Sequence, residues 1–102
     1  MTYSEKVEES VEFADLINKV QSVLDFVCSE NDELKIERDC AIRNNDPYYY
    51  QAINNNMKAN YIVTSTLLAI RNDIETMHDD IRADINQEKN ALSTADQSED
   101  NA

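Results

Sequence analysis

The chain has 102 residues, of which 21 are Asp or Glu and nine are Lys or Arg, so its formal net charge is −12. It contains one Pro, two Cys and one His, and neither Gly nor Trp. A length near 100 residues is typical of one domain, and the absence of Gly excludes Gly-rich phosphate-binding loops. The negative charge argues against direct binding to nucleic acid or to an anionic membrane surface.

The first ten residues, MTYSEKVEES, carry acidic side chains and no apolar run, unlike a signal peptide. The least charged stretch, residues 48–70, contains four Asn and one Lys, which is too polar to cross a bilayer. We therefore expect a cytoplasmic protein that does not enter membranes. Cys28 and Cys40 are too few for a disulfide framework, and we expect both to be reduced and partly buried.

A long helix is predicted from about residue 2 to residue 44. Thr2 and Glu5 have the spacing of a capping box, which begins helices by pairing side chains with free backbone amides. A break or kink around residues 29–33 stays open, because these residues are weak helix formers. The helix carries a seam whose members alternate in spacing between four and three residues, as in helices that pack on another helix: Phe13, Ile17, Val20, Leu24, Val27, Asn31, Leu34, Arg38 and Ala41.

A turn is predicted at residues 44–47. Asn and Asp favour turns, and Asp46 followed by Pro47 has the order of an N-cap and a first helical residue. This is the one strong stop-and-restart signal in the chain.

A second helix is predicted from about residue 47 to residue 91, which makes residues 1–92 one helical hairpin. Residues 93–102, STADQSEDNA, are polar and acidic, and we expect them to form a disordered tail. The expected seam of the second helix consists of Ile53, Met57, Val63, Leu67, Ile70, Ile74, Met77, Ile81 and Ile85.

Two long helices joined by a short turn predict an all-α fold, an antiparallel, coiled-coil-like helical hairpin. With the turn centred near position 45.5, facing residues have numbers that sum to about 91, so Asn31 lies opposite Asn60. Two seam amides can hydrogen-bond each other and set the register. The alternative is that both face solvent or another subunit.

Apolar residues beside the seams remain uncovered in a single hairpin. The simplest cover is a second copy, which would make a homodimeric four-helix bundle. A different protein is the main alternative. The residues concerned are Leu16, Val23, Ile42, Tyr61, Ile62 and Leu68.

A tyrosine cluster follows the turn. Three adjacent tyrosines cannot all point into one seam, and tyrosine is common at protein interfaces. We expect a partner-binding patch there, although the cluster could instead cover the turn end of the protein's own bundle. Its candidate members are Tyr48, Tyr49, Tyr50, Arg43 and Lys58.

Charge is distributed unevenly along the chain. Residues 35–72 hold five basic and three acidic residues, whereas the remainder holds 18 acidic and four basic ones. Folding as a hairpin brings the acidic segments together at the open end, where they form either a surface for a basic partner or simply a solvated face. The candidate residues of this acidic end are Glu5, Glu9, Glu12, Asp73, Asp79, Asp80 and Asp84.

Glu75 and His78 have the Glu-x-x-His spacing that places two metal ligands on one helix face. The facing part of the first helix offers Phe13, Leu16 and Ile17 rather than an inward carboxylate. We therefore expect no metal site and no cofactor.

No convincing Ser–His–acid set or Cys–His pair is present, so we expect no enzymatic activity. The sequence favours a protein that acts by self-association and by binding another protein, as an adaptor, assembly factor or chaperone-like partner. The alternative is an acidic mimic of nucleic acid that inhibits a DNA- or RNA-binding protein.

Overall fold

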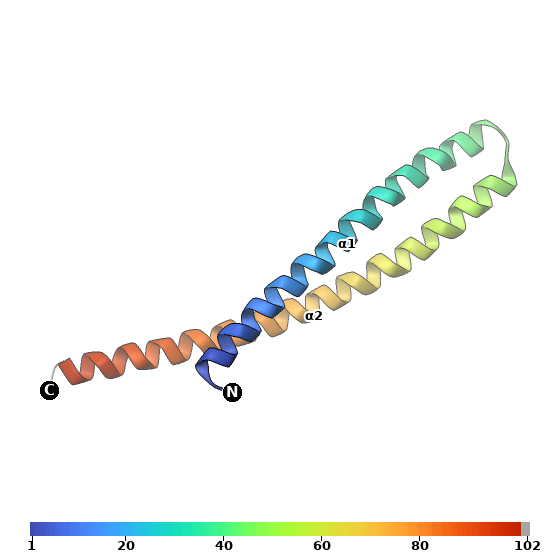
Figure 1. Cartoon of the computed structure of the whole chain (residues 1–102). Coiled ribbons are helices and arrows are strands. Elements are labelled where there is room, and N and C mark those ends of the chain that lie inside the picture. The colour runs from blue at the N-terminus through green and yellow to red at the C-terminus, as the bar shows by residue number, and fades with distance from the viewer. Residues whose placement is uncertain (101–102) are drawn as a thin grey trace. The chain divides into compact units, whose positions relative to one another are not determined.

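The computed structural model describes residues 1–100, with side chains as far as residue 93. Two helices make up this part of the chain, α1 from Tyr3 to Arg43 and α2 from Pro47 to Asp100, with no strand (Figure 1). The predicted all-α fold is thereby confirmed, with one turn joining two helices. α1 is continuous through residues 29–33, so no break occurs there. Over the described residues, neither helix has a segment both long and apolar enough to cross a bilayer.

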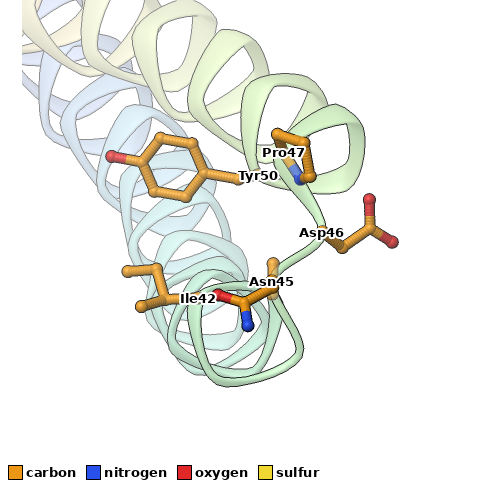
Figure 2. A pocket seen from close by; sticks show the side chains of 6 residues that line it. Ile42, Asn45, Asp46, Pro47 and Tyr50 are labelled. Atoms are coloured by element: carbon orange, nitrogen blue, oxygen red, sulfur yellow. The ribbon is translucent and has the colours of Figure 1, made fainter.

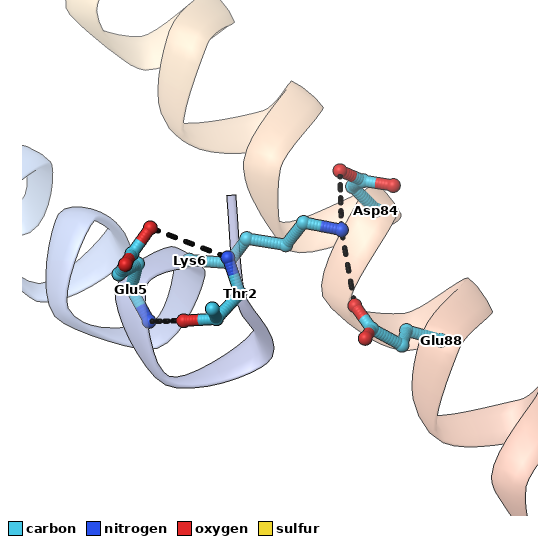
Figure 3. A network of polar contacts seen from close by, with 5 residues as sticks. All are labelled: Thr2, Glu5, Lys6, Asp84 and Glu88. Atoms are coloured by element: carbon cyan, nitrogen blue, oxygen red, sulfur yellow. Dashed lines mark hydrogen bonds and ion pairs between the residues drawn. The ribbon is translucent and has the colours of Figure 1, made fainter.

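α1 begins with the capping box that the sequence predicts. The Glu5 backbone N–H donates to Thr2 Oγ1 over 3.1 Å, and the Thr2 backbone N donates to Glu5 Oε2 over 3.2 Å (Figure 3). Two backbone donors that a helix start leaves without partners are thus satisfied by side chains.

The turn ends one helix and begins the next with only three residues between them. The Asp46 N–H donates to Ala41 O over 2.9 Å and the Asn45 N–H donates to Ile42 O over 3.2 Å, which is the Schellman pattern. This pattern needs a left-handed residue, and Asn45 takes that place with φ 50°. Asp46 also caps α2, because its Oδ1 accepts from the Tyr49 N–H over 3.0 Å.

The chain divides into two compact units. The turn unit comprises residues 19–71, in which α1 and α2 form a hairpin around the turn. The terminal unit comprises residues 1–18 and 72–102. Each helix contributes one segment to each unit.

The α1 seam matches the prediction at every position, since all nine expected residues are buried or half-buried. The expected register is also observed. Lys6, expected near position 85, contacts Asp84 and Glu88, and Gln21, expected near position 70, hydrogen-bonds Arg71.

The α2 seam is partly wrong in the prediction. Val63, Ile70 and Met77 are 42%, 42% and 47% exposed, whereas the residue after each of them is half-buried. Half-buried residues recur every seven positions from Tyr50 and Met57 onward. This repeat continues through the polar neighbours and not through Val63, Ile70 and Met77. The half-buried neighbours are Thr64, Arg71 and His78.

The apolar core is thin. Within the described residues, four of the five buried apolar side chains lie in the turn unit and one, Ile74, lies in the terminal unit. Most large apolar side chains on both helices therefore keep substantial contact with solvent. The four in the turn unit are Leu24, Val27, Ala41 and Ile53.

Two further expectations differ from the structure. α2 continues to Asp100, past the end expected near residue 91, because no Gly or Pro interrupts the helix there. Residues 101–102 of the expected tail lie outside the described residues. Cys28 and Cys40 are both exposed rather than partly buried, because they lie off the seam, and Cys40 Sγ accepts from Asn44 Nδ2 over 3.4 Å.

Candidate interaction surfaces

The turn unit presents two different flanks on either side of its seam. What we call the apolar flank carries four exposed apolar residues, Val23 and Phe26 on α1 with Val63 and Ile70 on α2. The α1 side of this flank also carries the exposed Glu30, Glu33 and Glu37. Val23, Val63 and Ile70 each directly precede a seam residue, and in an antiparallel helix pair such positions lie on the same side. Phe26 lies one turn beyond Val23 and is 68% exposed.

Contacts of Tyr49 show that these positions do share a side. Tyr49 and Glu37 also precede seam residues, on α2 and α1 respectively. Partial burial, followed by the charge of Glu37 and the hydrogen bond to it, raises the pKa of the Tyr49 hydroxyl. Residues of this type thus meet directly across the two helices.

The opposite flank of the turn unit mixes apolar and polar side chains, because Ile42, Tyr61 and Leu68 are exposed there as well. Cys28 and Lys35 of α1 line one hollow of about 210 Å³ together with Tyr61 of α2. Tyr61 also lines a neighbouring hollow of about 430 Å³ with Arg38 and Lys58. Basic and aromatic side chains are therefore mixed on this flank.

Asn31 and Asn60 line the same hollow of the opposite flank. Asn31 Oδ1 is buried and accepts no hydrogen bond within the described residues. The expected register thus brings both amides to one place, whereas their mutual hydrogen bond stays a prediction.

The turn itself carries a hollow of about 490 Å³. Figure 2 shows the Tyr50 ring on one side of it and Ile42 below, with the Asp46 carboxylate turned away. The lining is Ala41, Ile42, Asn45, Asp46, Pro47 and Tyr50.

The five predicted partner-binding residues lie in different surroundings. Tyr50 lines the turn hollow, Lys58 the opposite flank, and Arg43 a separate hollow of about 340 Å³ beside Ile36 and Asp39. Tyr48 is 88% exposed, and Tyr49 meets Glu37. The turn region therefore offers several small surfaces rather than one patch that includes all five.

The terminal unit carries almost all of the net charge. Its sequence holds 14 acidic and three basic residues, against seven and six in the turn unit, so the net charges are −11 and −1. All seven residues of the predicted acidic end belong to this unit: Glu5, Glu9, Glu12, Asp73, Asp79, Asp80 and Asp84.

Lys6 is the basic centre of the terminal unit's polar contacts. Its Nζ lies 3.0 Å from Glu88 Oε2 and 3.1 Å from Asp84 Oδ2 (Figure 3). These hydrogen bonds, Glu88 first, raise the pKa of Lys6. A hollow of about 380 Å³ in this unit is lined by Lys6 together with Glu9, Asp80 and Asp84.

The sequence pattern did not indicate the polar contact that Arg71 makes between the helices. Arg71 Nη1 donates to Gln21 Oε1, and Gln21 Nε2 donates to Asp25 Oδ1 over 2.8 Å. Extending the seven-residue repeat from Tyr50 through the polar positions of α2 would have placed Arg71 in the seam and indicated this contact.

Metal-binding geometry is not formed by the described side chains: no three of His, Cys, Asp and Glu gather closely enough to hold an ion. His78 and Glu75 are half-buried on α2 in the terminal unit, whereas both cysteines belong to the turn unit.

Comparison of the chain with protein-family models, curated proteins and solved structures gives no match.

Proposed function

We propose that this protein acts without catalysis, by associating with a second copy of itself and by presenting the resulting helical assembly to another protein. The observation that carries this proposal is the surface that each helix leaves exposed outside the α1–α2 seam.

Much of this surface is apolar. Large side chains such as Phe26, Ile36 and Ile62 are each about two-thirds exposed. Burying apolar surface is worth about 25 cal/mol per Å², so packing against further helices would stabilise the chain. A four-helix bundle of two copies supplies such packing with the fewest parts.

Sedimentation velocity across 1–100 µM protein tests self-association. We expect a species of twice the chain mass in the micromolar range, with helical circular dichroism at every concentration. A clean monomer throughout this range would contradict the self-association proposed here.

A second function is favoured by the charge of the terminal unit, −11 in net terms. A dense acidic surface can occupy the basic face of a nucleic-acid-binding protein, as an acidic mimic would. Such binding is electrostatic and weakens steeply with salt, whereas binding through packed apolar surfaces does not.

Salt and charge variants distinguish the two functions. The chain and an Asp73→Asn, Asp79→Asn, Asp80→Asn variant are immobilised and exposed to extract of the host cell. Partners released by about 0.5 M salt and lost on the variant would support the mimic. Partners that persist in both conditions would support the helix-packing function.

A further inference from the structure

We propose that the terminal unit opens and closes under the control of its charge: its α1 and α2 segments separate at low ionic strength, while the turn unit stays paired. The segments are residues 1–18 and the part of α2 from residue 72 onward. All the contacts involved lie within one chain, so the inference does not depend on the proposed self-association.

Apolar contact between the two segments is limited. Ile74 is the one buried apolar side chain of this unit among the described residues, whereas the turn unit has four. Helices in proteins are held mainly by the packing of an apolar face, so these segments gain less from pairing than the helices of the turn unit do. The other apolar seam residues of the unit are only half-buried, namely Phe13, Ile17, Ile81 and Ile85.

Carboxylates from both segments lie together beside this weak seam. Glu9 of α1 lines the hollow of about 380 Å³ together with Asp80 and Asp84 of α2. Glu9 and Asp84 each directly precede a half-buried residue, which places them on the same side of the helix pair. Like charges in such an arrangement repel each other across the two helices.

Lys6 bridges the two segments but neutralises only part of this charge. Its Nζ contacts both Asp84 and Glu88 of α2 (Figure 3). Four carboxylates thus lie in or beside the hollow that Lys6 lines. Met1 lines the same hollow, and its α-amino group is the second cation there. The cluster stays negative even when both cations are counted.

The segments also repel each other as wholes. Residues 1–18 hold five acidic residues and one basic residue, and residues 72–102 hold nine and two, so their net charges are −4 and −7. Packed helices have axes about 8–10 Å apart. The Debye length is about 30 Å at 0.01 M salt and falls below about 8 Å above 0.15 M, so salt removes most of this repulsion.

The Lys6 contacts respond less to salt than the repulsion does. Their distances, 3.0 and 3.1 Å, are well below the Debye length at 0.15 M salt. Added salt therefore weakens the longer-range repulsion first and favours the closed pair.

Amide hydrogen exchange at single-residue resolution measures the opening of each unit in the intact chain. At about 0.01 M salt, we expect the amides of Phe13 and Ile81 to be protected at least about 10-fold less than those of Val27 and Leu67 in the turn unit. At about 0.5 M salt, the protection of Phe13 and Ile81 should rise at least about 3-fold. The turn unit, with a net charge of −1, should change little and serves as the internal control.

A matched pair of variants separates the local charge from general effects of salt. Glu9→Gln with Asp80→Asn removes two carboxylates of the cluster and retains both Lys6 contacts. Glu33→Gln with Asp39→Asn removes the same charge from exposed positions of the turn unit. At about 0.01 M salt, we expect the first pair to raise the protection of the terminal unit at least about 3-fold and the second to leave it unchanged.

Each outcome bears on the proposal. Equal protection of the two units at low salt would overturn it, because the terminal unit would then not open on its own. Lower protection that responds neither to salt nor to Glu9→Gln with Asp80→Asn would show opening without control by charge, and would overturn it as well. So would an equal effect of the two variant pairs on the terminal unit.

Discussion

Ile53 tests whether the thin core of the turn unit holds its two helices together. Its side chain is 2% exposed, whereas that of Ile62, on the same helix, is 65% exposed. Replacing each with Ala removes the same three carbon atoms and adds the same gain in helix propensity, about 0.4 kcal/mol. The difference between the two variants therefore isolates the effect of burial.

The structure sets the magnitude. Removing three buried carbons costs about 2.4 kcal/mol in transfer free energy, and an incompletely filled cavity adds to this cost. We expect Ile53→Ala to lower the free energy of unfolding by about 2–3 kcal/mol after the propensity gain. Ile62→Ala should stay within about 0.5 kcal/mol of the parent protein.

Urea unfolding followed by circular dichroism at 222 nm measures both values. All samples are held at one protein concentration, because association contributes to apparent stability. A shift of 2–3 kcal/mol should lower the melting temperature by about 10–20 °C in a chain of this size. Equal stabilities of the two variants would refute the view that the α1–α2 seam stabilises the turn unit.

Two further predictions concern the turn and the ion pairs. Asn45 has φ 50°, a left-handed conformation that costs Ala more than Asn or Gly, so Asn45→Ala should destabilise the fold by about 1 kcal/mol. Asn45→Gly should have a melting temperature equal to or above that of the parent protein. Equal melting temperatures of the two variants would contradict the left-handed turn. Hydrogen bonds to Glu88 and Asp84 raise the pKa of Lys6, so the folded state binds this proton more tightly than the unfolded state. The resulting stability is complete below pH 10.5 and is lost as pH rises through the raised value. Stability should therefore fall above pH 10.5, and less steeply in Lys6→Met; identical curves for the two proteins would exclude a contribution from Lys6. The raised pKa of Tyr49 acts in the same direction, and Tyr49→Phe isolates it.

Local chemistry allowed the helix boundaries near the turn and at the N-terminus to be predicted. Thr2 and Glu5 satisfy each other's backbone donors, and Asp46 caps the residues that directly follow it. Such contacts span three residues, so they depend little on the rest of the fold. The end of α2 had no comparable signal, and the helix continues well past the position expected for it.

The candidate surfaces were predicted less completely. Sequence periodicity identified uncovered apolar residues such as Val23 and Leu68, and the structure shows them exposed. It did not separate the apolar flank from the opposite one, because that distinction depends on which side of the seam each residue takes. The exposed Phe26 was missed since it lies outside any apolar repeat.

By itself, the sequence determined the two helices, their turn, their register and the seam of α1. Only the tertiary structure decided which of two columns of α2 side chains faces α1. One column is apolar and includes Val63 and Ile70, and the other is polar and includes Thr64 and Arg71. Val63 and Ile70 are adjacent in sequence to Thr64 and Arg71, so both columns follow the same seven-residue repeat about 100° apart on the helix. The polar column lies at the seam, where Arg71 donates a hydrogen bond to Gln21 of α1. The apolar column is left on the outside.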